Sequence, residues 1–322
     1  MTKSHRRPLA MAATALIAGL ALLAGCGGGG DEDDAGGPGS GASLTIADKG
    51  FSESSIVAQL YAQALEGQGF DVEVTSLGST EIADRAIRDG EIDLYPEYTG
   101  TAFLNVLGRA AADAPDEDTE TAVFDQVAEA YTERGLTALP PAPYTNGNEV
   151  ACTEGAAEEH GIATLSDLGR ASGDLVYSAN AEHLTRDDGL PLLQREYGVS
   201  FRDVITVDIS LRYRPIEDGD ADCVYAFGTD PALATLPLVV LEDDKGTFSA
   251  GVPFQTFPVV RSEFLEGLSD EARTALESTL ASVNELLTNE AVPELVAKVD
   301  FDQEDPRDVA DDFLAESLEP AA

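Results

Sequence analysis

The chain has 322 residues, and its 60 Asp and Glu against 19 Lys and Arg give a formal net charge of −41. Apolar residues make up 43 %, which is enough for a hydrophobic core and disfavours a disordered or fibrous chain. The acidic balance argues against nucleic acid as a partner, because phosphate binding needs clustered Lys and Arg. We therefore expect a folded, acidic protein of about two domains.

The N-terminal segment has the pattern of an export signal. A basic start precedes an uncharged apolar run at 9–23, which is shorter than the roughly 20 residues that a transmembrane helix needs. The run ends in Leu-Ala-Gly-Cys26, which resembles the bacterial lipobox and makes Cys26 the predicted lipidation site. We expect 1–25 to be a lipoprotein signal peptide, and the mature chain to be anchored to the cell membrane on its extracytoplasmic side.

A glycine-rich segment at 26–43 follows the predicted anchor. It contains four consecutive acidic residues at 31–34 and few apolar ones, so we expect a lipid-anchored flexible linker. A metal site in the acidic run is the alternative, but a block of like charges is more often a solvated spacer.

From residue 44 onward, strand patterns alternate with helix patterns. Strands are predicted at 44–47, 70–75, 92–95, 149–152, 174–178, 203–208, 222–227 and 238–241. Helices are predicted at 56–65, 80–88, 100–107, 119–135, 154–160, 190–198, 230–236, 262–267, 270–288, 290–298 and 307–318. Strand–helix–strand order with short loops indicates parallel β-α-β units and an α/β fold.

Two proline-bearing stretches divide this series. We interpret 139–143 and 253–258 as irregular crossovers between two α/β lobes. Lobe one then comprises 44–144 and 252–322, and lobe two comprises 145–251. A ligand cleft is expected between the lobes, at the carboxyl ends of the strands.

No catalytic motif is present in the sequence: it lacks HExxH, GxSxG and a Walker A loop. We therefore predict no enzymatic activity, no metal and no cofactor. Cys152 and Cys223 are the thiols left after Cys26, and an exported chain favours a disulfide between them. The alternatives are two separate buried thiols, or a nucleophilic cysteine paired with His160 or His183.

Several motifs match one family of transport proteins. They are Lys49-Gly50-Phe51, Gly78-Ser79-Thr80-Glu81, the run from Asp93 to Thr101, the run from Arg186 to Pro191, Tyr197-Gly198, Thr229-Asp230 and the run from Leu241 to Lys245. Over about 44–318 the chain resembles the substrate-binding lipoproteins of ABC importers for glycine betaine, choline and other quaternary amines. The resemblance implies a type II periplasmic-binding-protein fold with two α/β lobes.

The resemblance also implies a set of ligand-binding residues. By matching positions these are Lys49, Glu81, Tyr98, Thr101, Arg186 and Phe227. Family members often carry a Tyr where the first crossover enters lobe two, a position near Asn148 or Glu149 here. Glu149 either faces a cationic amine or is a solvated loop residue.

The aromatic box implied by the family is depleted in this chain. Phe227 stands where many members have Tyr, and no Tyr follows the run that ends at Lys245, although Phe254 or Phe257 lies near enough to substitute. Tyr95 is predicted to be a core residue, and Tyr213 is a weaker candidate for ligand contact. The solute itself therefore stays open within the class of glycine betaine, choline and carnitine.

The resemblance implies a membrane-tethered solute receptor. We expect a monomer that closes its lobes on an osmoprotectant around hinges at 140–144 and 250–254, and passes the solute to an ABC permease. A solute sensor without transport is the alternative, and a Cys/His enzyme is a less favoured one.

Overall fold

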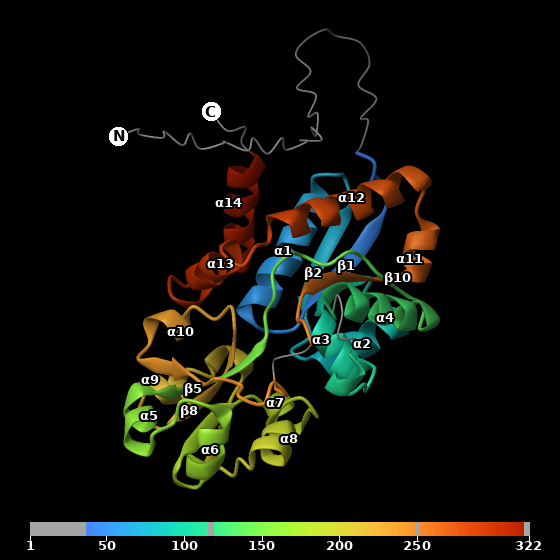
Figure 1. Ribbon diagram of the computed structural model, residues 1–322. Coiled ribbons are helices and arrows are strands. Elements are labelled where there is room, and N and C mark those ends of the chain that lie inside the picture. The colour runs from blue at the N-terminus through green and yellow to red at the C-terminus, as the bar shows by residue number, and fades with distance from the viewer. Residues whose placement is uncertain (1–36, 115–118, 249–251, 319–322) are drawn as a thin grey trace, which may run out of the picture. The chain divides into compact units, whose positions relative to one another are not determined.

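The computed structural model describes residues 37–114, 119–248 and 252–318, all of which belong to one unit of the chain. Two five-stranded sheets organise this unit (Figure 1). We use "lobe one" for the elements built on the sheet with strand order β2-β1-β3-β10-β4, and "lobe two" for those built on the sheet β7-β6-β8-β5-β9.

The sheet of lobe one combines parallel and antiparallel pairs. Its strands are β1 (Ser43–Asp48), β2 (Asp71–Ser76), β3 (Leu94–Tyr98), β4 (Leu136–Ala138) and β10 (Thr256–Arg261). β1 runs parallel to β2 and β3, whereas β10 is antiparallel to both β3 and β4. All five residues of β3 are buried, as expected for a strand covered on both faces.

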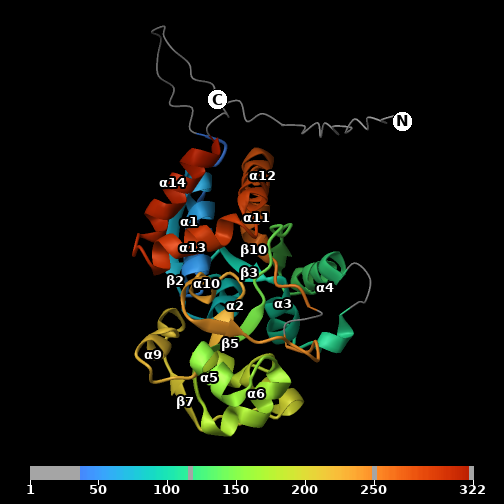
Figure 2. The same cartoon turned by 60° about the vertical axis from the view of Figure 1, so that its left-hand side comes forward.

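Helices cover both faces of this sheet. They are α1 (Ser52–Glu66), α2 (Thr80–Asp89), α3 (Thr99–Thr101), α4 (Thr119–Glu133), α11 (Ser262–Gly267), α12 (Asp270–Leu286), α13 (Ala291–Asp300) and α14 (Pro306–Leu318). In both ribbon views α1, α12, α13 and α14 gather on one side, and α2, α3 and α4 on the other (Figures 1 and 2). The core divides in the same way, because one apolar cluster joins α1 to α12 and α13, and another joins α2 to α4.

Lobe two repeats the sheet plan with shorter helices. Its strands are β5 (Asn148–Thr153), β6 (Val176–Ala179), β7 (Asp203–Thr206), β8 (Cys223–Phe227) and β9 (Leu238–Val240). Its helices are α5 (Glu154–His160), α6 (Leu165–Ala171), α7 (Ala181–Thr185), α8 (Leu190–Leu192), α9 (Arg214–Glu217) and α10 (Ala232–Thr235). Here β6 is parallel to β7 and β8, and β5 is antiparallel to β8 and β9.

Short turns of tighter or wider helix complete the elements. The chain continues as π-helix from α3 over Ala102–Val106 and from α8 over Leu193–Tyr197. Turns of 3-10 helix lie at Ala111–Asp113, Ser172–Asp174 and Ile209–Leu211. The predicted helices near 100–107 and 190–198 are thus confirmed in position, but each changes its helical pitch partway along.

The interpretation of 253–258 as an irregular crossover holds for 253–255 but was wrong for 256–258, which belong to β10. This stretch leads into β10, which lies between β3 and β4 and pairs with both. Pro258 stands opposite Pro96 of β3. A proline cannot donate to a ladder and usually excludes an interior strand, which is why the sequence pattern concealed this one.

The N-terminal boundary also differs from expectation. Residues 37–43 were assigned to the flexible linker, but Gly39 N–H donates to the Gln68 carbonyl at 2.9 Å and β1 begins at Ser43. This part of the segment is therefore packed against lobe one. The remainder of the predicted linker, the signal peptide and Cys26 lie outside the described residues.

Two crossovers connect the lobes and lie side by side. Ala142 N–H donates to the Thr256 carbonyl at 2.7 Å, and Asn146 N–H donates to the Phe254 carbonyl at 2.9 Å. An isolated antiparallel bridge joins Thr145 to Gln255. The chain thus enters and leaves lobe two through a short hydrogen-bonded pair of segments.

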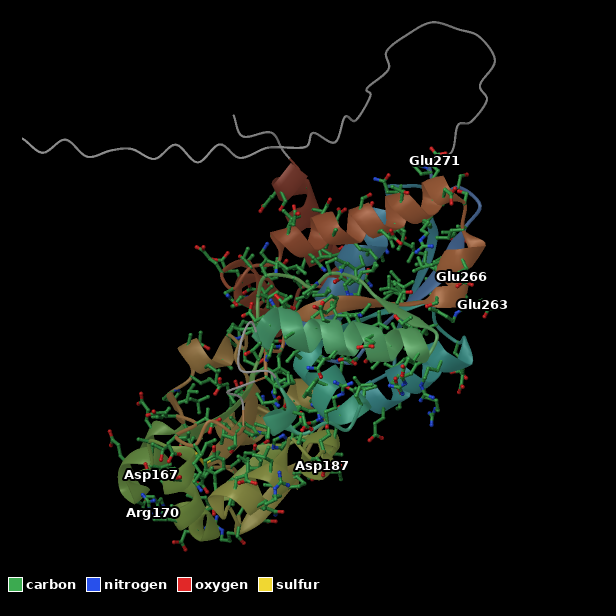
Figure 3. The ribbon with its side chains drawn as sticks, turned by 45° about the vertical axis from the view of Figure 1, so that its right-hand side comes forward. Asp167, Arg170, Asp187, Glu263, Glu266 and Glu271 are labelled. Atoms are coloured by element: carbon green, nitrogen blue, oxygen red, sulfur yellow. A yellow bond between two sulfur atoms is a disulfide. The ribbon has the colours of Figure 1, made fainter. Side chains whose placement is uncertain are left out.

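The acidic residues lie mainly on the surface. Glu263, Glu266 and Glu271 are exposed and project outward from α11 and α12, and Asp187 does so in lobe two (Figure 3). Such a distribution follows from the cost of burying an unpaired charge. It makes the few buried carboxylates informative.

Candidate ligand-binding site

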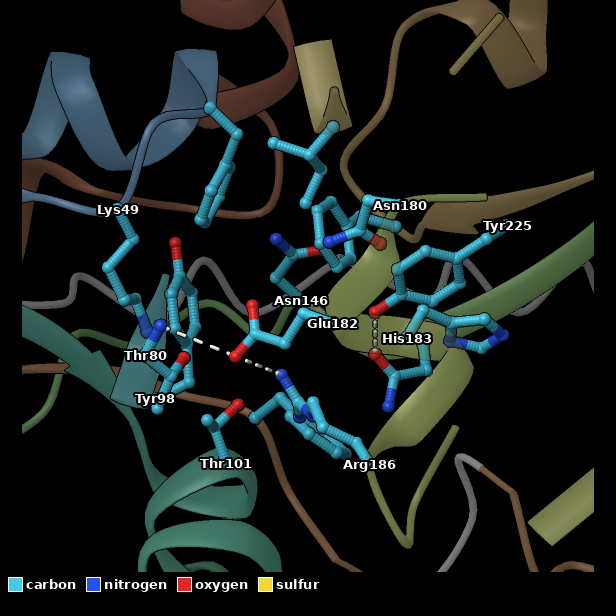
Figure 4. A pocket seen from close by; sticks show the side chains of 15 residues that line it. Lys49, Thr80, Tyr98, Thr101, Asn146, Asn180, Glu182, His183, Arg186 and Tyr225 are labelled. Carbon is cyan, nitrogen blue, oxygen red and sulfur yellow. Dashed lines mark hydrogen bonds and ion pairs between the residues drawn. The ribbon is translucent and has the colours of Figure 1, made fainter. Parts of the chain in front are cut away.

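A cavity of about 30 Å³ is lined by residues from both lobes (Figure 4). Lys49 directly follows β1 and Tyr98 ends β3, whereas Asn180 directly follows β6 and Phe227 ends β8. Because these parallel strands end at the cavity, their side chains converge there, as in other open α/β sheets. The lining consists of Lys49, Phe51, Thr80, Tyr98, Thr101, Asn146, Asn148, Asn180, Glu182, His183, Arg186, Ile209, Tyr225, Phe227 and Phe254.

The sequence-predicted site residues divide into two groups. The structure brings Lys49, Tyr98, Thr101, Arg186 and Phe227 together in this lining. Two predicted carboxylates do not belong to it.

Glu81 is exposed on α2 and borders a neighbouring surface hollow, which shares Thr80, Glu182 and Arg186 with the cavity. Glu149 is half-buried and borders another hollow, beside the crossovers. Burial, with a further contribution from Asp243, raises the pKa of Glu149 to about 7. The carboxylate that does reach the cavity belongs to Glu182.

Three aromatic rings form a cluster at the cavity. The centroid of Phe51 lies 6.1 Å from that of Tyr98 in lobe one and 5.2 Å from that of Phe227 in lobe two. Sequence reasoning missed Phe51 as a site residue, although it ends the Lys49-Gly50-Phe51 motif. Gly50 has φ +80°, and a Cβ there would lie 2.9 Å from the Gly78 Cα, so only glycine fits the turn that places Phe51.

Lys49 is a buried cation that already has a partner. Its Nζ lies 2.6 Å from Glu97 Oε1 and 4.5 Å from the centroid of the Tyr98 ring. The same Glu97 oxygen accepts the Tyr98 N–H at 2.7 Å. These contacts fix the Tyr98 backbone and the Lys49 ammonium relative to each other.

Glu53, on the first turn of α1, collects hydrogen bonds behind the cavity. Its carboxylate accepts from Tyr98 at 2.7 Å, Tyr144 at 2.8 Å and, through both oxygens, Asn146 Nδ2 at 3.1 Å, and it also accepts from the hydroxyl of Thr229 in lobe two. Burial raises the pKa of Glu53, and these donors offset part of that effect. The residue therefore connects lobe one, the crossover and lobe two.

Arg186 is the buried cation of lobe two. Its Nε and Nη2 donate to the two oxygens of Asp188 at 2.8 and 2.6 Å. Burial alone would raise the pKa of Asp188, but the Arg186 guanidinium, together with Asn105 and His183, lowers it below its ordinary value. Asn105 of lobe one donates to the same carboxylate at 2.7 Å, so this ion pair also joins the lobes.

Glu182 makes a further contact between the lobes. Its Oε1 accepts the backbone N–H of Thr80, the first residue of α2, at 3.3 Å. It also lies 3.6 Å from Arg186 Nη1, and both interactions are drawn in Figure 4. A carboxylate is favoured at the positive end of a helix dipole.

The remaining polar wall belongs to lobe two. Tyr225 donates to Asn148 Oδ1 at 2.6 Å, and its ring stacks on His183 with centroids 3.9 Å apart. His183 Nε2 lies 3.0 Å from the Tyr177 hydroxyl, and burial lowers the His183 pKa to about 3. His183 is therefore neutral at physiological pH. Tyr213 donates to Asp230 and does not line the cavity.

The predicted disulfide is confirmed. Cys152 of β5 and Cys223 of β8 stand opposite each other in the antiparallel ladder and are joined by an S–S bond. Neither thiol is free to act as a nucleophile paired with a histidine. Tyr95, predicted to be a core residue, is fully buried in the cluster between α2 and α4.

Within residues 37–114, 119–248 and 252–318, no group of three or more His, Cys, Asp and Glu side chains is placed to hold a metal ion. No helix in the described part of the chain is both long enough and apolar enough to cross a bilayer.

Comparison with known proteins agrees with this architecture. A crystal structure of a glycine betaine/carnitine/choline ABC transporter protein superposes with a TM-score of 0.62 at 22 % identity, covering 85 % of this chain and 97 % of that one. Structures of this kind confirm the type II binding-protein fold. A glycine-betaine-binding protein of Pseudomonas aeruginosa is 31 % identical over 85 % of this chain and 87 % of its own length.

Other relatives carry different ligand names. The ergothioneine transport permease and binding protein EgtU of Helicobacter pylori is 29 % identical over 84 % of this chain but only 47 % of its own length. The family model for the substrate-binding domain of ABC-type glycine betaine transport systems matches residues 42–316. This is a family of extracytoplasmic transport proteins and not of enzymes, and the chain belongs to it.

Proposed function

We propose that this protein captures a quaternary amine outside the cytoplasm and delivers it to an ABC permease in the membrane. The observation that carries the proposal is the cluster of Phe51, Tyr98 and Phe227 at a cavity between the lobes. The ligand names of the relatives support the same class, since they include glycine betaine, carnitine and choline.

Aromatic rings suit this ligand for a physical reason. A quaternary ammonium has no N–H to donate, so hydrogen bonding cannot hold its cationic end. A ring face attracts such a cation through its quadrupole, with about 0.5–2 kcal/mol for each ring. Phe51 and Phe227 supply this attraction without a hydroxyl that would need a partner.

Entry of the solute requires the lobes to separate. A cavity of about 30 Å³ has room for a water molecule but not for a quaternary amine. The two crossovers are the proposed hinge, and the bonds from Thr229 to Glu53 and from Asn105 to Asp188 are the contacts that closure would remake.

Retention at the membrane is the second part of the proposal. Cys26, released from a signal peptide at 1–25, would carry the lipid, and the acidic tether after it would give the receptor reach. A Cys26→Ser variant should appear in the soluble extracytoplasmic fraction. If the processed variant stays with the membrane, the anchor lies elsewhere.

The binding role is tested with the purified protein and with variants of Tyr98, one of the three clustered aromatic residues. A quaternary amine that binds the native state should raise the Tm, whereas a matched primary amine should not. Tyr98→Ala should weaken binding by about 1–3 kcal/mol through loss of a ring face, and Tyr98→Phe should weaken it much less.

Phe301→Ala serves as the control for these variants, since Phe301 is 46 % exposed and lies outside the cavity. If the quaternary amine no longer raises the Tm of the Tyr98→Ala variant but still raises that of the control, the aromatic cluster is supported as the binding site. If no quaternary amine shifts the Tm of the wild-type protein, the proposed function is wrong.

A further inference from the structure

Two features of the cavity narrow the class of solute: its charged side chains and the Asn180 side-chain oxygen, which has no hydrogen-bond partner among the described residues. We infer that the preferred solute is a quaternary cation that carries a hydroxyl group and no carboxylate. The inference rests on the proposed function, because it concerns the same cavity. It assigns Asn180 and Glu182 as the residues that set this preference.

Both cations of the cavity are already neutralised by buried carboxylates. Lys49 has Glu97 at 2.6 Å, and the side chains of this pair are 4 % and 0 % exposed. Arg186 is held by Asp188 through two parallel N–H donors. A carboxylate on the solute would have to compete with these partners in a site shielded from water, where charge repulsion is strong.

Glu182 already occupies the two positions that would stabilise a solute carboxylate, beside the Thr80 N–H and beside Arg186. Its Oε1 lies 3.3 Å from the first N–H of α2 and 3.6 Å from Arg186 Nη1. A helix N-terminus and a guanidinium are the two groups that most favour an anion. The cavity therefore supplies its own carboxylate at this point.

The charge balance around the cavity is negative. Lys49 and Arg186 face three carboxylates, those of Glu97, Glu182 and Asp188, or four when Glu53 is ionised. With or without a proton on Glu53, the carboxylates outnumber the cations. Such a site attracts a monocation and discriminates against a zwitterion, whose carboxylate adds to the excess.

Asn180 supplies a hydrogen-bond acceptor, which a cation without a hydroxyl or N–H cannot use. The residue is 8 % exposed, follows β6 directly and lines the cavity. Its Oδ1 has no hydrogen-bond partner among the described residues. A buried carbonyl oxygen without a donor is costly, so a solute with a hydroxyl donor gains from pairing with it.

The first experiment uses the wild-type protein and three related cations. Isothermal titration calorimetry with choline, tetramethylammonium and glycine betaine separates the hydroxyl from the carboxylate, because all three share the quaternary ammonium. We expect choline to bind at least about tenfold more tightly than either of the others. Equal or tighter binding of glycine betaine would overturn the inference.

The second experiment assigns the residues. Asn180→Leu should weaken choline binding about tenfold and leave tetramethylammonium unchanged, because only choline has a hydroxyl to lose. Glu182→Gln should weaken choline and strengthen glycine betaine, since it removes one carboxylate from the cavity. The matched control is Glu271→Gln, which changes an exposed carboxylate on the first turn of α12, outside the cavity lining, and should alter neither affinity.

The outcomes separate the inference from the function on which it rests. Failure of all three cations to bind would overturn both. Binding of all three with no preference for choline would overturn the inference and leave the quaternary-amine receptor intact. Equal weakening of choline and tetramethylammonium by Asn180→Leu would show a packing role in place of hydroxyl recognition, and the comparison of wild-type affinities does not depend on that variant folding.

Discussion

The two lobes each present one buried cation to the cavity, but they hold it differently. In lobe one, Lys49 directly follows β1 and Glu97 lies in the neighbouring strand β3, and the pair contacts Tyr98 of the same lobe. In lobe two, Arg186 and Asp188 are two residues apart, and their carboxylate also receives Asn105 from lobe one. The cation of lobe one is therefore held by its own lobe, whereas the carboxylate that holds the cation of lobe two also depends on the contact between lobes.

The largest expected effect comes from removing one carboxylate of these pairs. Asp188→Ala should lower the free energy of unfolding by about 3–5 kcal/mol, because it leaves a buried guanidinium that cannot lose its charge. Glu97→Ala should cost less, since the Lys49 ammonium keeps its contact with the Tyr98 ring. Urea unfolding of both variants measures the difference, and equal losses would contradict the contrast between the lobes.

The next largest effect on stability is expected from the disulfide, which crosslinks two strands of lobe two and has no counterpart among the described residues of lobe one. Its closed loop of about 72 residues corresponds to about 4 kcal/mol in the chain-entropy model. Reduction should lower the Tm, and solute affinity should stay almost unchanged at temperatures where the protein remains folded.

Intact-mass measurement of the unreduced protein after alkylation tests the bond itself. Labelling of both Cys152 and Cys223 would contradict it. A large loss of affinity on reduction, without loss of folding, would mean that the bond also orders the cavity.

A smaller effect is expected from the contact that joins the lobes at Asp188. Asn105→Ala removes a hydrogen bond to a carboxylate and should weaken solute binding by about 1–2 kcal/mol, with less effect on unfolding. Calorimetry gives the affinity, and Ser278→Ala on the exposed face of α12 is a control. An unchanged affinity would mean that this contact does not contribute to closure.

The smallest effect concerns pH and the half-buried Glu149. Burial raises its pKa to about 7 from an ordinary value of 4.5, so the native state holds this proton more tightly than the unfolded state. Its contribution to stability is present below pH 4.5 and is lost as the pH rises through 7. Glu149→Gln should therefore reduce the fall in Tm between pH 5.5 and 8. Identical pH profiles for wild type and Glu149→Gln would refute this.

Sequence reasoning was strongest where helical and strand periodicity is long. The long helices α4 and α12 were predicted at nearly their observed bounds, and α1 from its second turn onward, because apolar residues recur regularly along them. β10 was missed because Pro258 lies inside it. α6 was missed because it is too short to show an apolar period, although Thr164 and Asp167 form a capping box that marks its start.

The site was predictable where one contiguous motif forms it. Tyr98 and Thr101 lie in a single run that ends β3 and begins α3, so a motif match located both. Glu182, in the short helix α7, and Asn180, directly before it, were missed because they lie outside the matched motifs, and Glu182 meets lobe one only through a tertiary contact. Glu81 was assigned from its motif, but the helix turns it outward while the carboxylate in the cavity comes from the other lobe.

The paired crossovers have a consequence for engineering. Because Thr145 bridges Gln255 and Asn146 N–H bonds the Phe254 carbonyl, the two cuts that would excise lobe two fall next to each other. Neighbouring ends are what domain insertion and circular permutation require. We expect this joint to accept a graft, in which lobe two of a related receptor with another specificity replaces the native one while lobe one keeps its own aromatic wall.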